Sequence, residues 1–253
     1  MLRRRPKRRR PVGDVDELFT RFLGEWPVLS AQERVDLVDR VEVLLASKSW
    51  EAARGFELTD EMCTVIAAQA ALVALNFDLL VYRHVRAIVV HPHAVTVNEE
   101  RPGAVPGVFA SGSGPLDGEA HHNRGPIVLA WDAVRHDTRH RGTGRNVVVH
   151  EFTHKLDMAD GLVDGTPGDI DPALRQKWEA VCEREFEALR SAEAPPSSII
   201  RDYAATDRGE FFAVVAELFF ERPVQLQTIH PDLYEVFRGF FRQDPVARRP
   251  VDQ

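Results

Sequence analysis

The residues best placed to do chemistry lie in the segment 147–157, VVVHEFTHKLD, which contains the pattern H-E-x-x-H. On a helix, His150 and His154 lie about one turn apart on the same face, so both imidazoles can reach one metal ion. Glu151 follows the first histidine, and its carboxylate can act as a general base on a zinc-bound water that serves as the nucleophile. The pattern therefore predicts one Zn²⁺ per chain and hydrolytic chemistry.

An ordinary helix with two half-buried histidines and a solvated glutamate is the alternative explanation of this pattern. Three valines precede His150, and Leu156 and Met158 continue the apolar side, so the helix is expected to be buried. Buried imidazole and carboxylate groups cost free energy unless they have partners. The buried context therefore favours a metal site.

A catalytic zinc site usually has three protein ligands and keeps its fourth position open. The segment 210–220, EFFAVVAELFF, is apolar nearly all round and predicts a buried helix that carries Glu210 and Glu217. These two acids are about two turns apart on the same side, and only one of them can reach the metal. Glu210 could instead form a capping box with Asp207, and Glu217 could instead orient a ligand histidine. The pattern favours Glu210 slightly and leaves both acids as candidates.

Three segments resemble the Mlc titration factor A family of bacterial zinc peptidases: HEFTHKLD at 150–157, DYAAT at 202–206 and EFFAV at 210–214. The similarity covers most of residues 25–245. The HEFxH and EFFA pieces are also similar to the catalytic domain of anthrax lethal factor. The resemblance implies a zincin-like fold of the gluzincin type, with Glu210 as the third zinc ligand. It also implies that Tyr203, seven residues before Glu210, assists the reaction.

From this resemblance we expect a zinc metallopeptidase, and specifically an aminopeptidase that acts on short peptides. His150, His154 and Glu210 are expected to hold the zinc, Glu151 to act as general base, and the Tyr203 hydroxyl to stabilise the oxyanion. The alternative function is a regulatory binding protein, because the family is named for sequestering the transcriptional repressor Mlc. In that case peptidase activity would be secondary.

Other potential ligands are weaker candidates. Asp157, one turn after His154, is expected either to orient a ligand histidine or to cap nearby backbone. The remaining histidine pairs are expected to make no metal site: His136 and His140, which lack a following acid, the adjacent His121 and His122, and the pair His91 and His93.

The composition is that of a globular protein. Hydrophobic residues make up 44 % and charged residues 28 % of the 253-residue chain. No apolar run is long enough to span a bilayer, and no secretory signal peptide is apparent. Cys63 and Cys182 are expected to be buried thiols rather than a disulfide, which favours a cytoplasmic location. The sequence does not indicate an oligomeric state.

The charge is uneven along the chain. Residues 1–10 hold seven of the 32 Lys and Arg residues, which leaves 25 against 39 acidic residues in the rest. The basic segment is expected to be a disordered tail, solvated rather than bound to nucleic acid or to an anionic membrane. The acidic remainder does not look like a nucleic-acid-binding surface, so the expected partners are peptide substrates and a repressor protein of the Mlc type.

The hydrophobic pattern predicts a mostly helical α+β fold with a small sheet beside the H-E-x-x-H helix. Helices are expected at about 14–26, 30–47, 60–75, 172–189, 210–220 and 232–242, with a capping box from Ser30 to Glu33 and a cap at Thr59. Strands are expected at 79–82, 87–90 and 125–131, and weakly at 95–97. We expect a single metallopeptidase domain at 13–245, helical to about 78 and catalytic from 79, between a tail at 1–12 and a C-terminal tail at 246–253.

Two segments that precede the metal helix suggest how substrate could be bound. Residues 101–118 hold five glycines and three prolines and are expected to form either a lid or an inert insertion. Pro126 at the head of the strand 125–131 suits either the start of a strand or an edge strand, and an edge strand just before the H-E-x-x-H helix could bind an extended peptide by backbone pairing.

Overall fold

The structure is a computed structural model that describes residues 14–53, 55–93, 118–120, 125–191 and 199–249. The predicted basic tail at 1–12, the weak strand at 95–97, the pair His121 and His122, and residues 101–117 of the predicted loop lie outside these residues. The division of the chain into tails and a single domain therefore remains a prediction.

The helices of the N-terminal part are α1 (Val15–Phe22), the 3₁₀ helix η1 (Trp26–Val28), α2 (Ala31–Ser47) and α3 (Asp60–Val73). Of these, α2 and α3 begin at the predicted caps. Ser30 and Glu33 form the predicted capping box, in which each side chain accepts the backbone N–H of the other, at 2.8 and 3.3 Å. Thr59 caps α3, which is buried along nearly its whole length and packs against α2.

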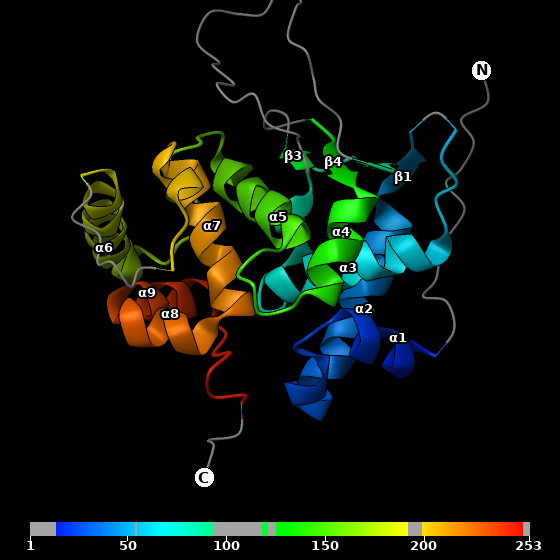
Figure 1. Cartoon of the computed structure of the whole chain (residues 1–253), viewed down its shortest axis with the longest axis horizontal. Helices are drawn as coiled ribbons and strands as arrows, with labels where there is room; N and C mark the ends of the chain where they lie inside the picture. Colours follow the sequence, from blue (N-terminus) through cyan, green and yellow to red (C-terminus); the bar gives the residue numbers. More distant parts are fainter. Residues whose placement is uncertain (1–13, 54, 94–117, 121–124, 192–198, 250–253) are drawn as a thin grey trace, which may run out of the picture.

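Helices also build most of the rest of the described chain (Figure 1). They are α4 (Trp131–Arg139), α5 (Val147–Asp157), η3 (Met158–Asp160), α6 (Pro172–Arg190), η4 (Asp202–Ala205), α7 (Arg208–Glu221), α8 (Pro223–Ile229) and α9 (Pro231–Phe241). α8 is not predicted from the sequence, because it is short and follows α7 after a single residue. The metal helix α5 packs against α7 on one side and α3 on another.

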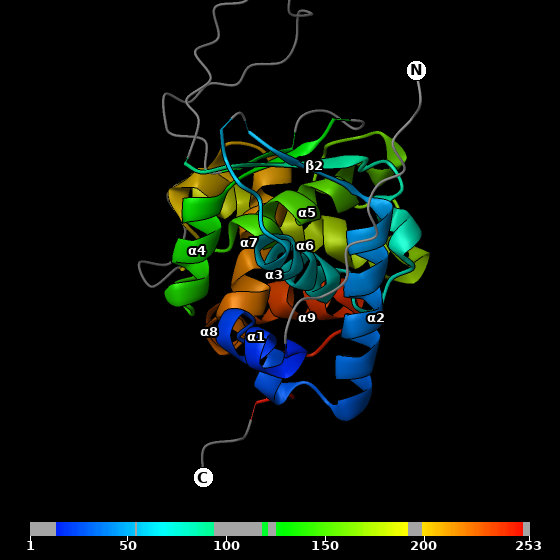
Figure 2. The ribbon, with the colours of Figure 1, turned by 90° about the vertical axis from the view of Figure 1, so that its right-hand side faces the viewer.

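The described strands form one sheet in the order β1-β2-β4-β3. They are β1 (Ser49–Ala52), β2 (Ala87–His91), β3 (Gly118–Ala120) and β4 (Ile127–Ala130). β1, β2 and β4 are parallel, with Ile88 opposite Ile127, whereas β3 runs antiparallel to β4. Figure 2 shows the sheet above α3 and α5, and α5 contacts both β3 and β4. A mostly helical α+β fold with a small sheet beside the metal helix is thus confirmed.

The strand predicted at 79–82 is wrong. These residues form the 3₁₀ helix η2 (Leu79–Tyr82), because the Asp78 side chain accepts the Leu80 N–H at 2.9 Å and starts a turn. Val81 and Tyr82 are buried in this turn, and a short apolar run fits a buried turn as well as a strand. The pattern also misses β1, in which only Trp50 is part-buried and no alternation is visible.

Of the two interpretations of Pro126, the structure agrees with a strand start, and the edge-strand alternative is wrong. β4 lies between β2 and β3, and Pro126 only precedes the first paired residue, Ile127. Its backbone is already paired on both sides by described strands. An extended peptide therefore cannot add to β4, and the outer strands of the described sheet are β1 and β3.

A cluster of aromatic side chains joins α6, α7 and α9. The ring of Trp178 on α6 stacks on Phe237 of α9, with centroids 4.8 Å apart, and meets Phe212 of α7 at 5.3 Å. Phe212 also contacts Phe240 and Phe241, at 5.7 and 6.4 Å. All five rings are buried, so this cluster fixes the position of α7.

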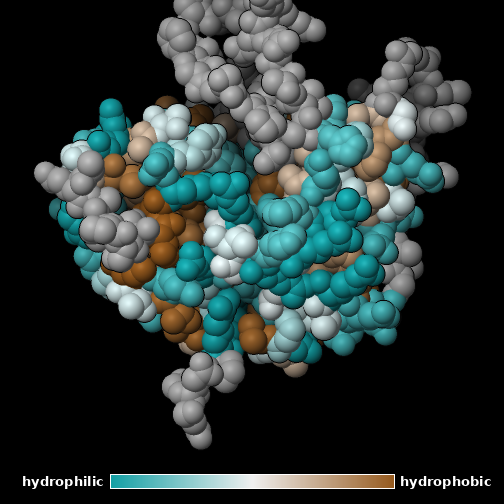
Figure 3. All heavy atoms as spheres, viewed as in Figure 1, coloured by the Kyte–Doolittle hydropathy of each residue, from teal (hydrophilic) through white to brown (hydrophobic). Residues whose placement is uncertain are grey.

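Residues 246–249, which the sequence assigns to a C-terminal tail, lie against the N-terminal part. Arg248 contacts the Glu33 carboxylate at 2.6 Å, and Arg249 lies 3.5 Å from Glu25. No disulfide joins Cys63 to Cys182 in the described chain. A bilayer-spanning helix is not found among the described residues. On the face shown in Figure 3, hydrophilic residues cover most of the surface and hydrophobic residues gather toward α6.

Candidate metal centre

α5 starts with its backbone amides satisfied by side chains from three segments. The Asn146 side chain accepts the Val149 N–H at 3.1 Å, and Asp137 of α4 accepts the Val147 N–H at 2.9 Å. The Asn146 N–H itself donates to Glu217 of α7 at 2.7 Å. From its second residue onward the helix is buried. Its histidines therefore stand on an element that the core holds rigidly.

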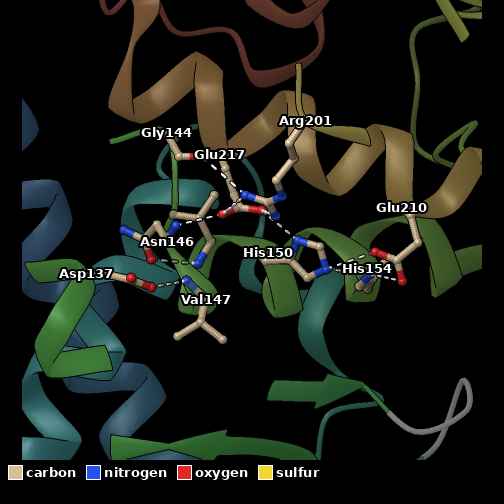
Figure 4. A network of polar contacts seen from close by, with 10 residues as sticks. Asp137, Gly144, Asn146, Val147, His150, His154, Arg201, Glu210 and Glu217 are labelled. Atoms are coloured by element: carbon tan, nitrogen blue, oxygen red, sulfur yellow. Dashed lines mark hydrogen bonds and ion pairs between the residues drawn. The ribbon is translucent and has the colours of Figure 1, made fainter. Parts of the chain in front are cut away.

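His150 and His154 share one face of α5, and Glu210 approaches them from the first turn of α7 (Figure 4). The Nε2 atoms of the two histidines are 3.1 Å apart. Glu210 Oε2 lies 3.1 Å from His150 Nε2, and Glu210 Oε1 lies 3.4 Å from His154 Nε2. Within the described residues, this is the group of His, Cys, Asp and Glu side chains that converges closely enough to hold a metal ion.

The distances in this group suit a four-coordinate zinc ion. Bonds of about 2.1 Å in a tetrahedral arrangement put neighbouring ligand atoms roughly 3.4 Å apart, close to the separations in this group. The donor set of two imidazoles and one carboxylate is also one that zinc accepts. The residues present therefore fit the metal that the pattern predicts.

The electrostatics of the group favour a positive charge among the three side chains. Burial lowers the pKa of His150, but its contacts with Glu210 and Glu217 outweigh burial and raise that pKa to about 10. Burial raises the pKa of Glu210, but His150 and His154 hold it well below its usual range. A divalent cation supplies the charge that this arrangement favours.

Glu151 lies in the same buried environment as the two histidines. Its side chain is 3 % exposed, and its Oε2 atom has no hydrogen-bond partner among the described residues. Burial raises the pKa of Glu151 to about 7, and the histidines on either side only partly offset this rise. A carboxyl group in this state can take up or release a proton near neutral pH.

Glu217 contacts the opposite edge of His150 from Glu210. Its Oε1 atom lies 2.7 Å from His150 Nδ1. Burial raises the pKa of Glu217, but His150 and Arg201 outweigh burial and lower it. Because an ionised carboxylate can only accept, His150 Nδ1 is the donor and Nε2 is the nitrogen available to a metal. The structure thus brings Glu210 to both Nε2 atoms and brings Glu217 behind one of them.

Glu210 lies both at the cap of α7 and beside the two histidines. Asp207 caps α7 by accepting the Glu210 N–H at 2.9 Å, as in a capping box. The Glu210 carboxylate does not return to the Asp207 backbone and is directed to the histidines instead. The backbone N–H of Glu210 thus bonds to the cap, while its carboxylate contacts His150 and His154.

Tyr203 lies in η4, next to the metal group. Its ring centroid is 6.2 Å from that of His150, and the residue is 52 % exposed. Burial of the hydroxyl and its interaction with Glu210 raise the pKa of Tyr203 above its usual value. Tyr203 is therefore the predicted site residue that solvent reaches most easily.

Asp157 caps nearby backbone, one of the two roles expected for it. It is fully buried, and its Oδ2 atom accepts the Gly165 N–H at 3.1 Å. Burial raises the pKa of Asp157 to about 7. Neither its Oδ1 atom nor His154 Nδ1 has a hydrogen-bond partner among the described residues.

The other described histidines lie outside the metal group. His136 on α4 and His140, the residue that follows the helix, are exposed, with stacked rings whose centroids are 4.2 Å apart. His93 is exposed and contacts Asp132 at 3.0 Å.

Two residues that support the group are not found by sequence reasoning. Arg201 contacts both carboxylate oxygens of Glu217, and its only sequence signal is its place two residues before Tyr203. Glu221, one turn after Glu217, accepts hydrogen bonds from the Asn146 side chain and the Gly142 N–H, each at 3.0 Å. Its spacing of four residues from Glu217 places it on the same side of α7.

Comparisons with known proteins indicate a metallopeptidase family. Residues 3–242 match the model of the family described as glucose-regulated metallo-peptidase M90. An uncharacterized protein of Synechocystis is 35 % identical over 220 residues, which cover 86 % of this chain and 79 % of that protein. Mlc titration factor A of Serratia proteamaculans is 32 % identical over 226 residues, 87 % of this chain and 84 % of that protein.

Mlc titration factor A of Pectobacterium atrosepticum is 31 % identical over 226 residues, 87 % of this chain and 83 % of that protein. The resemblance found in the three short segments therefore extends over most of the chain and is confirmed. The family match spans both the H-E-x-x-H helix and the helix that carries Glu210. The chain belongs to the glucose-regulated metallopeptidase M90 family.

Proposed function

We propose that this protein is a zinc-dependent metallopeptidase, an aminopeptidase that hydrolyses short peptides in the cytoplasm. The observation that carries the proposal is the convergence of His150 Nε2, His154 Nε2 and the Glu210 carboxylate, with separations of 3.1 to 3.4 Å. The buried carboxylate of Glu151 stands beside them. Membership of a metallopeptidase family supports the same class of reaction.

In this proposal His150, His154 and Glu210 hold the zinc ion. When bound, zinc supplies Lewis acidity, which polarises a carbonyl group and lowers the pKa of a coordinated water toward neutrality. Glu217 keeps the proton of His150 on Nδ1, so that Nε2 stays available. Three protein ligands leave a fourth position for water or substrate.

Glu151 acts as the general base in this proposal. Its carboxylate accepts a proton from the attacking water and then donates it to the amine that leaves when the peptide bond breaks. The buried position of Glu151 next to His150 and its unpartnered Oε2 atom support this role.

Tyr203 stabilises the oxyanion that forms on the scissile carbonyl. Its raised pKa keeps the hydroxyl protonated at neutral pH, so the group can donate a hydrogen bond. Its partial exposure beside Glu210 supports contact with a bound peptide.

The preference for a free amino end comes from the family resemblance. It is tested by comparing turnover of a chromogenic amino-acid amide with turnover of the same amide acetylated on its α-amine. We expect hydrolysis of the free amine only. Equal rates on both substrates would show an endopeptidase instead.

Metal content provides the test of the ligand assignment. We expect one zinc per chain in the wild type and loss of zinc in Glu210→Ala. In Glu217→Ala we expect a lower zinc affinity, with one zinc per chain still bound when zinc is in excess. Glu183→Ala, an exposed acid on α6, is the matched control and should bind zinc like the wild type. Loss of zinc in Glu217→Ala with retention in Glu210→Ala would reverse the two assignments.

The relatives named Mlc titration factor A favour a second candidate function, the binding of a repressor protein of the Mlc type. Glu151→Gln separates the two functions because it removes the general base and leaves the surface intact. A peptidase role predicts that this variant loses turnover. A binding role predicts that it still captures a purified Mlc repressor with the affinity of the wild type.

A further inference from the structure

Arg201 connects three segments that build the candidate metal centre (Figure 4). It stands just before η4, and its guanidinium reaches Glu217 on α7 and Gly144 in the turn before α5. Its Nη2 atom lies 2.5 Å from Glu217 Oε1, and its Nη1 atom lies 3.3 Å from Glu217 Oε2. Nη1 also lies 3.4 Å from the Gly144 carbonyl oxygen.

The guanidinium fixes the plane of the Glu217 carboxylate. Glu217 Oε1 accepts hydrogen bonds from His150 Nδ1 and from Arg201 Nη2. Glu217 Oε2 accepts hydrogen bonds from the Asn146 N–H and from Arg201 Nη1. Each oxygen therefore has two donors, and the two arms of the fork hold both oxygens at once. Because Glu217 is 2 % exposed, the charge of Arg201 also offsets the cost of burying the carboxylate.

The same guanidinium lies against Tyr203. Its Cζ atom is 5.9 Å from the centroid of the Tyr203 ring, within the range of a cation–π contact. Tyr203 is half exposed, so neighbouring side chains hold only one part of its ring. Arg201 therefore contacts both the carboxylate that orients His150 and the tyrosine whose ring lies beside His150.

The third contact of Arg201 is with the backbone of the turn that precedes α5. Gly144 has a φ of +80°, and a Cβ atom there would lie 2.7 Å from Leu218 Cδ2 on α7. The chain is therefore pressed against α7 at this residue, which only glycine allows. Arg201 thus links the Gly144 carbonyl before α5 to Glu217 on α7.

We propose that Arg201 is a positioning residue, which holds Glu217 against His150 and holds the Tyr203 ring beside the same histidine. This inference rests on the proposed zinc site. Lysine cannot replace arginine here, because one ammonium group cannot contact both carboxylate oxygens and an aromatic face in the same way.

The first test compares Arg201→Ala and Arg201→Lys with Arg208→Ala. Arg208 is the matched control, because it also contacts both oxygens of a carboxylate, Glu183, at 2.8 and 2.7 Å, but at an exposed position. The zinc dissociation constant is measured by competition with a chelator, and the ligand geometry by the absorption spectrum of the Co²⁺ form. We expect zinc affinity to fall about 10- to 100-fold in Arg201→Ala and by less in Arg201→Lys, with an altered cobalt spectrum in both.

The second test uses turnover. In Arg201→Ala we expect kcat to fall and KM to stay near the wild-type value at saturating zinc. In a Tyr203→Phe background the loss of kcat on changing Arg201 should be smaller, because the hydroxyl that Arg201 positions is already gone. Its effect on zinc affinity should remain. If changing Arg201 lowers kcat by the same factor in the Tyr203→Phe background as in the wild type, the part of the proposal that concerns Tyr203 is overturned.

The outcomes separate this inference from the proposed function. A wild type that binds zinc without hydrolysing any peptide would overturn the peptidase proposal, and zinc affinity and the cobalt spectrum would still test Arg201. Wild-type affinity and spectrum in folded Arg201→Ala would overturn the positioning role. If Arg201→Ala does not fold, Arg201→Lys takes its place, and wild-type values in that variant would likewise contradict the inference.

Discussion

The two sides of α7 differ in the kind of side chain that they bury. One side carries Glu210, Glu217 and Glu221, which are spaced seven and four residues apart and form a stripe toward α5. The opposite side carries Phe212 and Phe219, which pack with rings from α6 and α9. The aromatic side needs only apolar area of the right shape, whereas each buried carboxylate needs a partner of its own.

The three glutamates of the stripe differ because their partners differ. Histidines outweigh burial at Glu210, and His150 with Arg201 outweighs burial at Glu217, so the pKa of each carboxyl is lowered. Burial raises the pKa of Glu221, and Asp137 and Glu217 add to the rise, because the hydrogen-bond donors to Glu221 among the described residues are neutral. The stripe thus combines a candidate metal ligand, Glu210, with an acid that contacts His150, Glu217. Its third acid, Glu221, has no cationic side chain acting on it among the described residues.

The largest predicted effect concerns the aromatic side. Phe212→Ala should lower the free energy of unfolding by about 3–5 kcal/mol, because it opens a cavity among Trp178, Phe237 and Phe240. Urea unfolding measures this loss. The folded variant should bind zinc as the wild type does, since the glutamates lie on the other side of α7. Val224→Ala, at an exposed position on α8, should change stability by less than about 0.5 kcal/mol.

A selective loss of zinc in folded Phe212→Ala would mean that the two sides are coupled and that the comparison fails. A stability loss below about 1 kcal/mol would show that the cavity is closed by neighbouring rings.

The second prediction concerns Tyr203, which lies in η4 next to Glu210 on the acidic side of α7. A substitution there should change the rate of the reaction and leave the stability unchanged. Tyr203→Phe removes the proposed oxyanion donor, so kcat should fall about 10²- to 10³-fold while zinc content and unfolding free energy stay at wild-type values. Steady-state kinetics and metal analysis measure both.

Tyr234→Phe is the matched control for this substitution. The Tyr234 hydroxyl donates to Asp244 at 2.6 Å and accepts the Val246 N–H at 3.1 Å, in a structural position. This variant should lose stability and keep kcat. Full activity in Tyr203→Phe would remove Tyr203 from the mechanism.

The third prediction concerns Glu25, a buried acid close enough to Glu221 for the two carboxylates to interact. Burial raises the pKa of Glu25 to about 7 and Glu221 adds to the rise, while Arg249 and Arg248 oppose it. The pKa returns to 4.5 on unfolding, so the folded state binds more protons between these values. Stability that is present below pH 4.5 is therefore lost as the pH rises through 7, by up to about 3 kcal/mol.

Glu25→Gln removes this titration. Its unfolding free energy relative to the wild type should rise by up to about 3 kcal/mol between roughly pH 4 and roughly pH 8 in urea titrations. Glu17→Gln, on the exposed face of α1, should show no such trend. A difference from the wild type that stays constant over the pH range would contradict the pKa assigned to Glu25.

The sequence predicts helix starts well, because a cap depends on hydrogen bonds between residues that are close together in the chain. The capping box at Ser30 and the caps at Thr59 and Asp207 each satisfy backbone N–H groups within three residues, so their helices start where expected. The short segment 79–82 is mispredicted because four apolar residues carry no period, and Asp78 makes them a turn.

Relations between distant segments are not visible in the pattern. β4 is internal because β3, which lies in a glycine-rich stretch, pairs with it. Glu217 can be suspected from its spacing, but its partner Arg201 comes from a different segment and has no periodic signal. The metal group itself is predictable because H-E-x-x-H is local and because Glu210 is one of few acids in an apolar helix. The roles of its members stay predictions until metal and activity are measured.

The smallest predicted effect lies at the start of α7, where the two uses of Glu210 meet. Asp207→Ala removes the cap on the Glu210 N–H and should cost about 1 kcal/mol of unfolding free energy, whereas Asp207→Asn keeps an acceptor and should cost little. Because the Glu210 carboxylate contacts the histidines rather than the cap, zinc affinity should stay close to wild type in both variants. A large loss of zinc affinity in both, with stability unchanged, would mean that the charge of Asp207 belongs to the metal group and that the acidic side begins one residue before the helix.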